Sequence, residues 1–415
     1  MATGTRSLDI WDILNPDQLA RHISNKFVEW ESMRNQWLDE KAEIREYIFA
    51  TDTSGTSNSA LPWKNSVHIP KLCQIRDNLN ANYMAALFPN DRPIKWEGDD
   101  ESSEAKTKRE VIEAYMANKM RMGGYRGTVQ QLVNDFTDYG NVFCMVEFVA
   151  EEFEDPITGE KHAGFVGPRA VRISPNDIVF NATAASFADS PKIIRELKSL
   201  GSLKADLQDH PENGYLEEVF EKVLNNRHQF SGLSQGDFKK ADAYQIDGFG
   251  SFLQYFQSEY VELLHFYGDI YDVNTQEFQK NRVITVVDRC YIIRNEPCPT
   301  WTGRPHIFHC GWRLRPDNLY AMGPLDNLVG MQYRIDHLEN AKSDAFDLII
   351  HPVMKVRGYV EDFDYGPGER IYCGDEGDVE FQSPDTTMLN ADTQIAGYEA
   401  KMEEMAGAPK QAMGF

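Results

Sequence analysis

A serine inside a glycine-flanked pentapeptide is the first residue whose type and spacing suggest chemistry. Ser234 stands in Gly232-Leu-Ser-Gln-Gly236, which matches the Gly-x-Ser-x-Gly pattern of a nucleophile elbow. Such an elbow needs an apolar strand before the serine and a packed helix after it. Here polar residues flank the pattern on both sides, at 225–229 and 237–240. We therefore interpret this segment as a loop and keep a serine hydrolase only as a lesser alternative.

Two further groups contain the residue types that bind metal ions. Cys298, His306, His309 and Cys310 lie within thirteen residues, but structural zinc sites use two tight ligand pairs at set spacings, which this group lacks. His306 and Cys310 can instead lie on the buried face of a short strand. The stretch 362–366, Asp-Phe-Asp-Tyr-Gly, resembles a calcium loop whose glycine comes one position early. We predict no metal ion and no cofactor.

Acidic side chains are so abundant that pairs of carboxylates suited to acid–base catalysis arise by chance. The 415 residues include 65 Asp and Glu against 42 Lys and Arg, a formal net charge of −23. The sequence has no phosphate-binding glycine loop, no dinucleotide fingerprint and no His-Glu-x-x-His motif. We predict that the protein is not an enzyme, with a carboxylate hydrolase as the lesser alternative. The negative charge also argues against tight binding of nucleic acid, because proteins that bind nucleic acid usually carry a basic surface patch.

Composition indicates a globular protein of two or three domains. Hydrophobic residues make up 41% of the chain and aromatic residues 12%, enough for sizeable cores. Apolar runs fall short of the roughly 18 residues that a membrane helix needs, and the first ten residues lack the apolar core of a signal peptide. We therefore expect no membrane association. Six scattered cysteines are typical of a reducing compartment.

Hydrophobic periodicity predicts an α+β fold, with helices in the first third, strands in the middle and one long helix late in the chain. A helical pattern over 203–224 is interrupted near 211–214. The other expected helices are 16–49, 71–87, 105–122, 128–139, 325–349 and 392–405. The expected strands are 142–149, 163–173, 178–180, 260–271, 282–294, 353–360 and 370–381.

The late helix carries apolar residues at alternating three- and four-residue spacings, which is typical of a seam packed against other helices. An ordinary core helix has the same periodicity, and Lys342 interrupts the seam. Its members are Leu328, Met331, Ile335, Leu338, Ala345 and Ile349.

Several motifs follow one another in a fixed order. A turn at 320–324, Tyr-Ala-Met-Gly-Pro, enters the late helix, and Pro352 starts a strand after it. Upstream lie 61–65, Leu-Pro-Trp-Lys-Asn, then 82–89 and 174–180; downstream lies 402–409. The helix itself carries Leu328, Gln332, Asp336, Leu338, Asn340, Asp344 and Ala345. In this order the motifs resemble the portal (head-to-tail connector) proteins of tailed bacteriophages, especially short-tailed phages, over about 60–410.

The resemblance implies a mixed wing domain with N-terminal helices, a helical stem and a small β-rich clip. By position, 1–200 is similar to the N-terminal part of the wing, 201–228 to the first stem helix and 229–316 to the clip. Residues 317–351 are similar to the second stem helix and 352–405 to the C-terminal part of the wing. Residues 406–415 are similar to the start of the tunnel loop that faces DNA, with Gly407, Ala408, Pro409, Lys410 and Gln411. Because portal proteins continue beyond this point with a long helix, we expect the loop to be incomplete here.

The resemblance also implies a function. Portal proteins form a homo-oligomeric ring, of twelve subunits, at one capsid vertex of the virion, and are made in the cytoplasm of the host bacterium. The ring is a conduit through which double-stranded DNA passes non-specifically during packaging and ejection. Expected partners are the major capsid and scaffolding proteins, the large terminase, and a head-to-tail adaptor or tail protein. The alternative is another virion structural protein, such as a tail adaptor or coat subunit.

The acidity of the C-terminal part fits a conduit. Between residues 359 and 404 there are 13 Asp or Glu but only two Lys or Arg. Facing inward in a ring, these carboxylates would repel the duplex and leave it free to slide, since each Lys or Arg contact with phosphate adds affinity. A solvated acidic face is the alternative interpretation.

Overall fold

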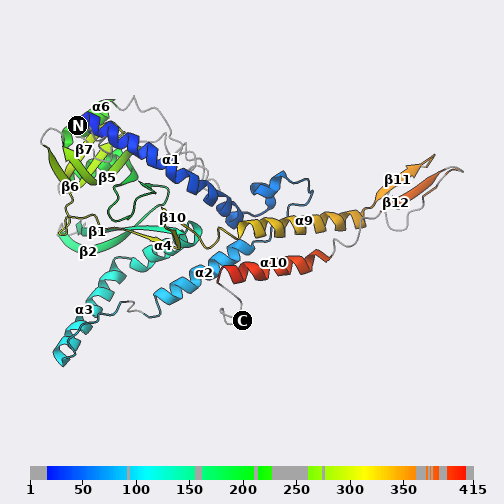
Figure 1. The fold of residues 1–415 in the computed structure, drawn as a ribbon, viewed down its shortest axis with the longest axis horizontal. Coiled ribbons are helices and arrows are strands. Elements are labelled where there is room, and N and C mark those ends of the chain that lie inside the picture. Colours follow the sequence, from blue (N-terminus) through cyan, green and yellow to red (C-terminus); the bar gives the residue numbers. More distant parts are fainter. Residues whose placement is uncertain are drawn as a thin grey trace, which may run out of the picture. The chain divides into compact units, whose positions relative to one another are not determined.

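The computed structural model describes residues 16–90, 94–154, 161–209, 214–226, 260–272, 276–360, 371–372, 374, 377–382 and 390–407. The chain mixes helices with small antiparallel sheets (Figure 1), so the predicted α+β class is confirmed. It divides into two compact units. The first unit comprises Met1–Arg45 and Arg76–Asp326, and the second comprises Glu46–Ile75 and Asn327–Phe415.

Two helices belong partly to each unit, and the remaining elements fall in one unit or the other. The shared helices are α1 (Pro16–Phe49) and α2 (Lys71–Leu87). The helices of the first unit are α3 (Ser103–Met122), α4 (Tyr125–Asp138), α5 (Leu200–Asp209) and α6 (Glu217–Asn226). Its strands are β1 (Asn141–Glu154), β2 (Lys161–Ile173), β3 (Ile178–Phe180), β4 (Lys192–Ser199), β5 (Tyr260–Asp272), β6 (Glu277–Val287), β7 (Tyr291–Pro297), β8 (Ile307–Gly311), β9 (Arg313–Arg315) and β10 (Asn318–Met322).

A five-stranded antiparallel sheet, in the order β3-β4-β5-β6-β7, forms the centre of the first unit. The amphipathic helix α1 buries Ile23 and Phe27 against Leu264 and Ile284 on one face of the sheet. Burial of each such side chain contributes about 1.5–3 kcal/mol. Neighbouring residues of a strand point to opposite faces, and Leu263 packs with the short helices α5 and α6 on the other face.

This sheet corrects two expected boundaries. Strand β4, expected in the wing, pairs with β5, expected in the clip, with Ile194 opposite His265. Residues 260–297 are therefore part of the first unit and not a separate clip domain of 229–316. The segment 201–228 is also not one stem helix, because α5 and α6 are short and pack Leu203 and Phe220 into the core beneath β5.

The expected single strand over 282–294 is two strands, β6 and β7, joined by a tight turn. Asp288 and Arg289 adopt positive φ angles of 47° and 59° there. Asp adopts this left-handed conformation more readily than most residues. The chain can therefore reverse at Asp288 although apolar residues alternate on both sides of the turn.

The other main sheet of the first unit has the order β2-β1-β8 and is covered by α4. Two acids of α4 are engaged by arginines: Asp135 by Arg172 of β2, at 2.5 and 2.7 Å, and Asp138 by Arg76, at 2.6 and 2.9 Å. Each is a two-point guanidinium–carboxylate contact, which fixes orientation as well as charge.

The second unit is built on two helices, α9 (Val329–Ile350) and α10 (Ala391–Met405), which lie alongside one another (Figure 1). A hairpin of β11 (Val353–Arg357) and β12 (Asp378–Gln382) falls between them in the sequence. The short 3-10 helices η1 (Thr53–Gly55) and η2 (Ser57–Ala60) belong to the same unit. Among the described residues, no helix combines the length and hydropathy needed to span a bilayer.

Candidate functional site

The most ordered polar feature of the second unit is a row of four side chains on α9. Gln332, Asp336, Asn340 and Asp344 are spaced by four residues, so they share one face of the helix. The first three are buried, at no more than 1% exposed. We call these four residues the polar ladder.

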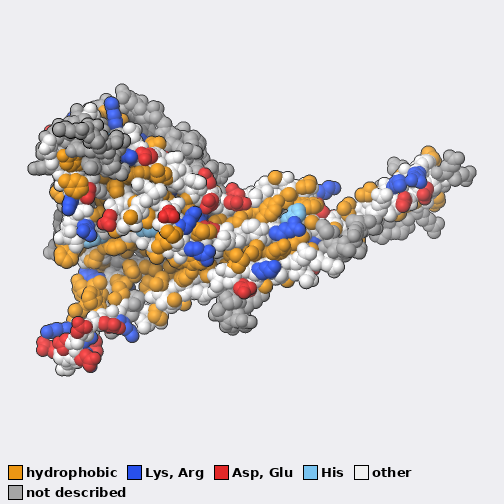
Figure 2. Space-filling view, in the orientation of Figure 1, with side chains coloured by type: hydrophobic (Ala, Val, Ile, Leu, Met, Phe, Trp, Pro, Cys, Tyr) orange, Lys and Arg blue, Asp and Glu red, His pale blue; other side chains and the backbone are white. Residues whose placement is uncertain are grey.

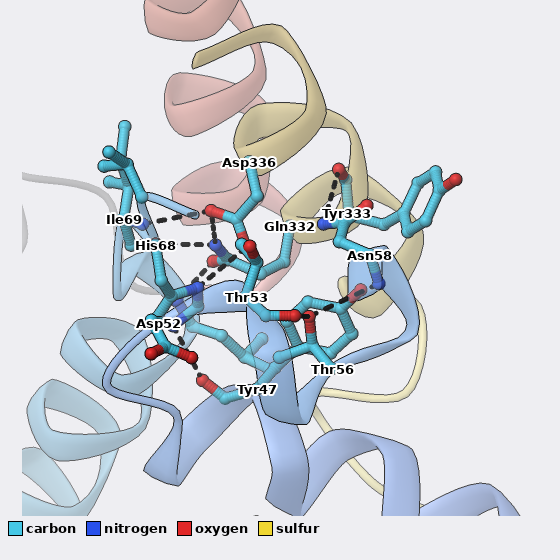
Figure 3. A network of polar contacts seen from close by, with 12 residues as sticks. Tyr47, Asp52, Thr53, Thr56, Asn58, His68, Ile69, Gln332, Tyr333 and Asp336 are labelled. Atoms are coloured by element: carbon cyan, nitrogen blue, oxygen red, sulfur yellow. Dashed lines mark hydrogen bonds and ion pairs between the residues drawn. The ribbon is translucent and has the colours of Figure 1, made fainter. Parts of the chain in front are cut away.

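The polar ladder hydrogen-bonds to the backbone of the extended segment 64–70 and of Leu72, in the first turn of α2. Figure 3 shows the part of this contact around Ile69, Gln332 and Asp336. Gln332 accepts from Leu72 N–H at 3.0 Å and donates to the Ile69 carbonyl at 2.6 Å. Asp336 Oδ1 accepts from Ile69 N–H at 3.0 Å and from Gln332 Nε2 at 3.0 Å. One residue of the segment is thus held through both of its backbone polar groups.

Further along the helix the same pattern repeats. Asn340 Oδ1 accepts from Val67 N–H at 2.7 Å, and its Nδ2 donates to the Val67 carbonyl at 2.9 Å. Asp344 accepts from the backbone N–H groups of Lys64 and Asn65, at 3.1 and 3.0 Å. The amide of Asn65 also donates to Asp344 and Asp347.

The physical role of the polar ladder is to replace a β-strand partner. An extended segment packed on a helix has no strand to pair with, and a buried backbone group without a partner costs about 1–3 kcal/mol. The carboxamides and carboxylates supply these partners. The Leu-Pro-Trp-Lys-Asn motif at 61–65 and the Gln-Asp-Asn-Asp series of α9 therefore belong to the same segment-on-helix contact.

A buried histidine closes the network (Figure 3). His68 Nδ1 lies 2.7 Å from Asp336 Oδ2, and its Nε2 lies 3.1 Å from the carbonyl oxygen of Tyr47. Its side chain is 1% exposed and that of Asp336 is 0% exposed. Asn58 adds a bond from Nδ2 to the carbonyl of Tyr333 at 3.3 Å. These contacts fix the segment to the helix, and His68 and Asp336, the titratable pair at the centre of the network, are both buried.

An acid–histidine–hydroxyl arrangement does occur in the first unit. His265 lies 3.0 Å from Glu196 Oε2 through Nε2 and 3.0 Å from Thr285 Oγ1 through Nδ1. The hydrogen bond to His265 lowers the pKa of Glu196 to about 2. Thr285 is completely buried within β6, so its hydroxyl cannot reach a substrate. Glu196, His265 and Thr285 therefore do not supply the accessible nucleophile that a hydrolase needs.

The candidate metal ligands are placed differently from our expectation. His309 points inward, stacked on Phe143 with ring centroids 4.9 Å apart, and its Nε2 lies 2.9 Å from Asn141 Oδ1. Burial lowers the pKa of His309 to about 4. His306 instead contacts Thr302, and Cys310 is exposed, because β8 turns these positions away from the core. Within the described ranges, no three His, Cys, Asp or Glu side chains lie close enough together to hold a metal ion.

Several candidate residues lie outside the described residues: Ser234, the 362–366 stretch, and Ala408, Pro409, Lys410 and Gln411 of the expected tunnel loop. Gly407 follows α10 with a φ of 70°, a left-handed conformation that commonly ends helices at glycine.

The apolar seam of α9 is buried over most of its length. Leu328, Ile335, Leu338 and Ala345 are buried and Met331 is half-buried. Ile349, near the end of the helix, is 37% exposed, so its expected packing stays a prediction. Two residues before it, Asp347 accepts from the side-chain amide of Asn65 at 2.9 Å.

The Tyr-Ala-Met-Gly-Pro turn at 320–324 has a packing role in the first unit. Tyr320 stacks on Trp37 of α1, with ring centroids 4.9 Å apart and planes at 19°. Asn141 bonds both backbone groups of Ala321 at 2.9 Å. Gly323 meets Gly140 so closely that a Cβ on Gly140 would lie 2.4 Å from the Gly323 nitrogen. The two glycines allow this contact between backbones.

The β11–β12 hairpin has one charged face and one apolar face. Its register places Lys355 opposite Glu380 and Arg357 opposite Asp378 on one face. The other face carries Met354, Phe381, Val356 and Val379. None of these four is buried, and Val356 is 52% exposed.

The four-residue spacing of Gln332, Asp336, Asn340 and Asp344 shows in the sequence that these side chains share one helix face. Spacing alone does not show that this face binds the backbone of residues 64–72. Comparison of the sequence with models of known protein families and with curated proteins finds no match in either.

Proposed function

We propose that the protein is a portal subunit, which forms a ring at the unique capsid vertex and serves as a conduit for double-stranded DNA. The proposal rests on the order of motifs given above and on the helix–hairpin–helix arrangement of the second unit. In this proposal α9 and α10 form the stem and the β11–β12 hairpin forms the clip. This assignment replaces 201–228 as the first stem helix, 229–316 as the clip and 352–405 as the C-terminal part of the wing.

The observation that carries the proposal is the hairpin, whose apolar face is exposed in the described part of the chain. A lone two-stranded hairpin is marginally stable in water, and this one has Met354, Val356 and Phe381 exposed on one face. The preceding end of α9 adds exposed Phe346 and Ile350. Exposed apolar residues gathered in this way mark interaction surfaces. Copies of the same chain arranged in a ring would cover them.

The charges of the hairpin are consistent with a head-to-tail contact. Strand β11 carries Lys355 and Arg357 as its charged residues, whereas β12 carries Asp378 and Glu380. Each strand has one edge without a strand partner in the described part of the chain. In a ring the two edges meet as different surfaces of neighbouring copies, which is the heterologous contact that closes rings. A basic strand beside an acidic one is then favourable.

Two of the four acidic residues of α10 form ion pairs within the second unit. Asp392 pairs with Lys342 at 2.8 Å, and Glu403 pairs with Lys71 at 2.5 Å. These two carboxylates hold α10 against its neighbours within the second unit. Glu399, Glu404 and the remaining acids of 359–404 stay the candidates for a channel surface that does not retain the duplex.

The proposal assigns the ring the partners of a portal: capsid and scaffolding proteins, the large terminase, and an adaptor or tail protein. It also places the protein in the virion at the head–tail vertex. No catalytic step is assigned to the chain.

The proposal is tested by imaging the full chain in negative stain and measuring particle masses by mass photometry. We expect rings of about twelve copies around a channel at least as wide as B-DNA, ~20 Å. Val356→Asp and Phe381→Asp should shift the population to monomers, whereas Glu218→Gln, at an exposed position of α6 outside the hairpin, should not. Monomers or dimers alone at micromolar concentration would contradict the proposal.

A further inference from the structure

Helix α3 and the segment before it form a surface that nothing in the described part of the chain covers. No residue of this 20-residue helix is buried. Val111, Ile112, Tyr115 and Met122 are all exposed large hydrophobic residues. An isolated helix of this length is marginal in water and usually depends on packing of an apolar face. Residues 94–122 are called the acidic arm below.

The acidic arm is ordered along its length. Trp96 N–H donates to Glu113 Oε1 at 2.9 Å, and Arg109 bonds the backbone carbonyl of Asp100. Ser102 caps the helix by accepting from Ala105 N–H at 3.2 Å. These contacts hold the segment against the helix, so its side chains are presented in a fixed arrangement.

The acidic arm contains seven Asp or Glu and six Lys or Arg, and its acids are concentrated at one end. Residues 97–104 contain no Lys or Arg and five acids: Glu97, Asp99, Asp100, Glu101 and Glu104. Figure 2 shows red side chains, with blue ones beside them, at the free end of α3. Glu97, Asp99 and Glu101 have no ion-pair partner among the residues that the structure describes.

A second surface of the first unit has the opposite character. Residues 298–316 contain no Asp or Glu, although the chain carries a net charge of −23. Arg304, Arg313 and Arg315 are exposed and form no ion pair within the described ranges. Trp301 is 94% exposed, and Leu314 is exposed beside the two arginines. Residues 298–316 are called the basic stretch below.

The basic stretch is also a built surface. Thr300 accepts at its carbonyl from Gly303 N–H at 2.9 Å, and its hydroxyl donates to the Arg304 carbonyl at 2.7 Å. The guanidinium of Arg313 lies over the Trp312 ring, 4.8 Å from its centroid. Trp and Arg are the residue types that most often anchor protein interfaces.

We propose that the acidic arm of one copy docks on the basic stretch of a second copy. The acidic end of the arm, residues 97–104, and the basic stretch each present unpaired charges of one sign, exposed apolar side chains lie on both surfaces, and the two signs are complementary. Opposite charges align such surfaces and exclude wrong partners, while the apolar residues supply most of the affinity. Because the two surfaces differ, the contact is heterologous and repeats around a ring. The inference rests on the ring proposed above and adds a second interface to it.

A nucleic-acid backbone is the other anionic partner that three arginines could bind. A second copy is favoured because it accounts for both surfaces. The exposed apolar residues and acids of the arm are complementary to the exposed apolar residues and arginines of the basic stretch. Duplex binding is therefore an outcome of the test.

The test uses charge reversal in the full chain. The variants are D99K/E101K, R313E/R315E and the four-fold combination. Matched controls are E217K/E218K on α6 and R21E/K204E on α1 and α5, which change the charge equally at exposed positions elsewhere. Ring formation is followed by sedimentation velocity over a concentration series, and duplex binding by fluorescence anisotropy with a 30-base-pair DNA. Far-UV circular dichroism checks the fold.

We expect each reversal to raise the concentration for half-assembly about tenfold or more, and the combination to restore it to within about threefold of the unmodified chain. The controls should assemble normally. If the unmodified chain forms rings and the reversals change nothing, or the combination does not restore assembly, the docking inference is wrong while the ring stands. If R313E/R315E loses only duplex binding, the basic stretch serves nucleic acid and the inference is again wrong. An unmodified chain that stays monomeric overturns both.

Discussion

The side chain of Asn340 holds both backbone polar groups of Val67, accepting from its N–H at 2.7 Å and donating to its carbonyl at 2.9 Å. A strand neighbour in a sheet makes the same two bonds. These residues are 273 positions apart in the sequence, so this contact ties the segment between α1 and α2 to the proposed stem helix.

Replacing Asn340 with Leu keeps the approximate size of the side chain but removes both bonds. We expect the second unit to lose about 2–4 kcal/mol of unfolding free energy, because two backbone groups of Val67 lose their partners. Hydrogen exchange at the Val67 amide should accelerate accordingly. Urea denaturation measures the stability loss, and Arg334→Gln, at an exposed position of the same helix, is the control. Equal stability of the two variants would contradict the role of the polar ladder.

Gly140 gives a sharper test of the first unit. Its φ is 71°, and a Cβ would lie 2.4 Å from the Gly323 nitrogen, so Gly140→Ala must both strain the backbone and push two segments apart. We expect a loss of about 3 kcal/mol or more in thermal or urea unfolding. Gly127, in the first part of α4, has nothing within 4 Å of its added Cβ. Gly127→Ala should therefore be neutral or stabilising by up to about 1 kcal/mol. Similar effects at both positions would refute the close backbone approach.

His309 makes the first unit sensitive to acid. Burial lowers its pKa to about 4 in the folded chain, against 6.5 for an ordinary histidine. Between these values the unfolded chain binds a proton that the folded chain does not, so stability rises with pH in this range. The contribution is complete above pH 6.5, is lost as the pH falls towards 4, and amounts to about 3 kcal/mol.

Substitution of His309 by Gln removes this titration and keeps a side-chain donor for Asn141. We expect the slope of unfolding free energy against pH to become flatter between pH 4 and 6.5. Denaturant titrations at pH 4.5, 5.5 and 7 measure this slope. Unchanged slopes in the Gln variant would show that other groups cause the acid sensitivity.

The local spacing of apolar residues predicts where the helices and strands of this chain lie better than it predicts which strands pair. The apolar spacing and the proline after the helix place α2 at 71–87, as observed, since these signals act within a few residues. The same signals cannot say that Ile194 of β4 pairs with His265 of β5, because 71 residues separate them and any strand offers similar edges. That missing information is why 260–297 was expected in a separate clip.

The candidate site was predictable in a similarly limited way. The polar residues at every fourth position of α9 were recognised as a motif, and so was the segment at 61–65. The contact between them is made to backbone N–H and carbonyl groups. Every residue type except proline has both groups, so the sequence does not show which residues are bound. The turn at Asp288 was missed because the apolar alternation of β6 continues into β7 without a glycine or proline to interrupt it.

The most direct test of the account is the mass and shape of the assembled full chain. Mass photometry and negative-stain imaging at micromolar concentration should give rings of about twelve copies with a central channel of at least ~20 Å, the width of a B-DNA duplex. The same measurement on Val356→Asp should give mainly monomers. Particles of one or two copies from the unmodified chain, or compact oligomers without a channel, would contradict the portal proposal.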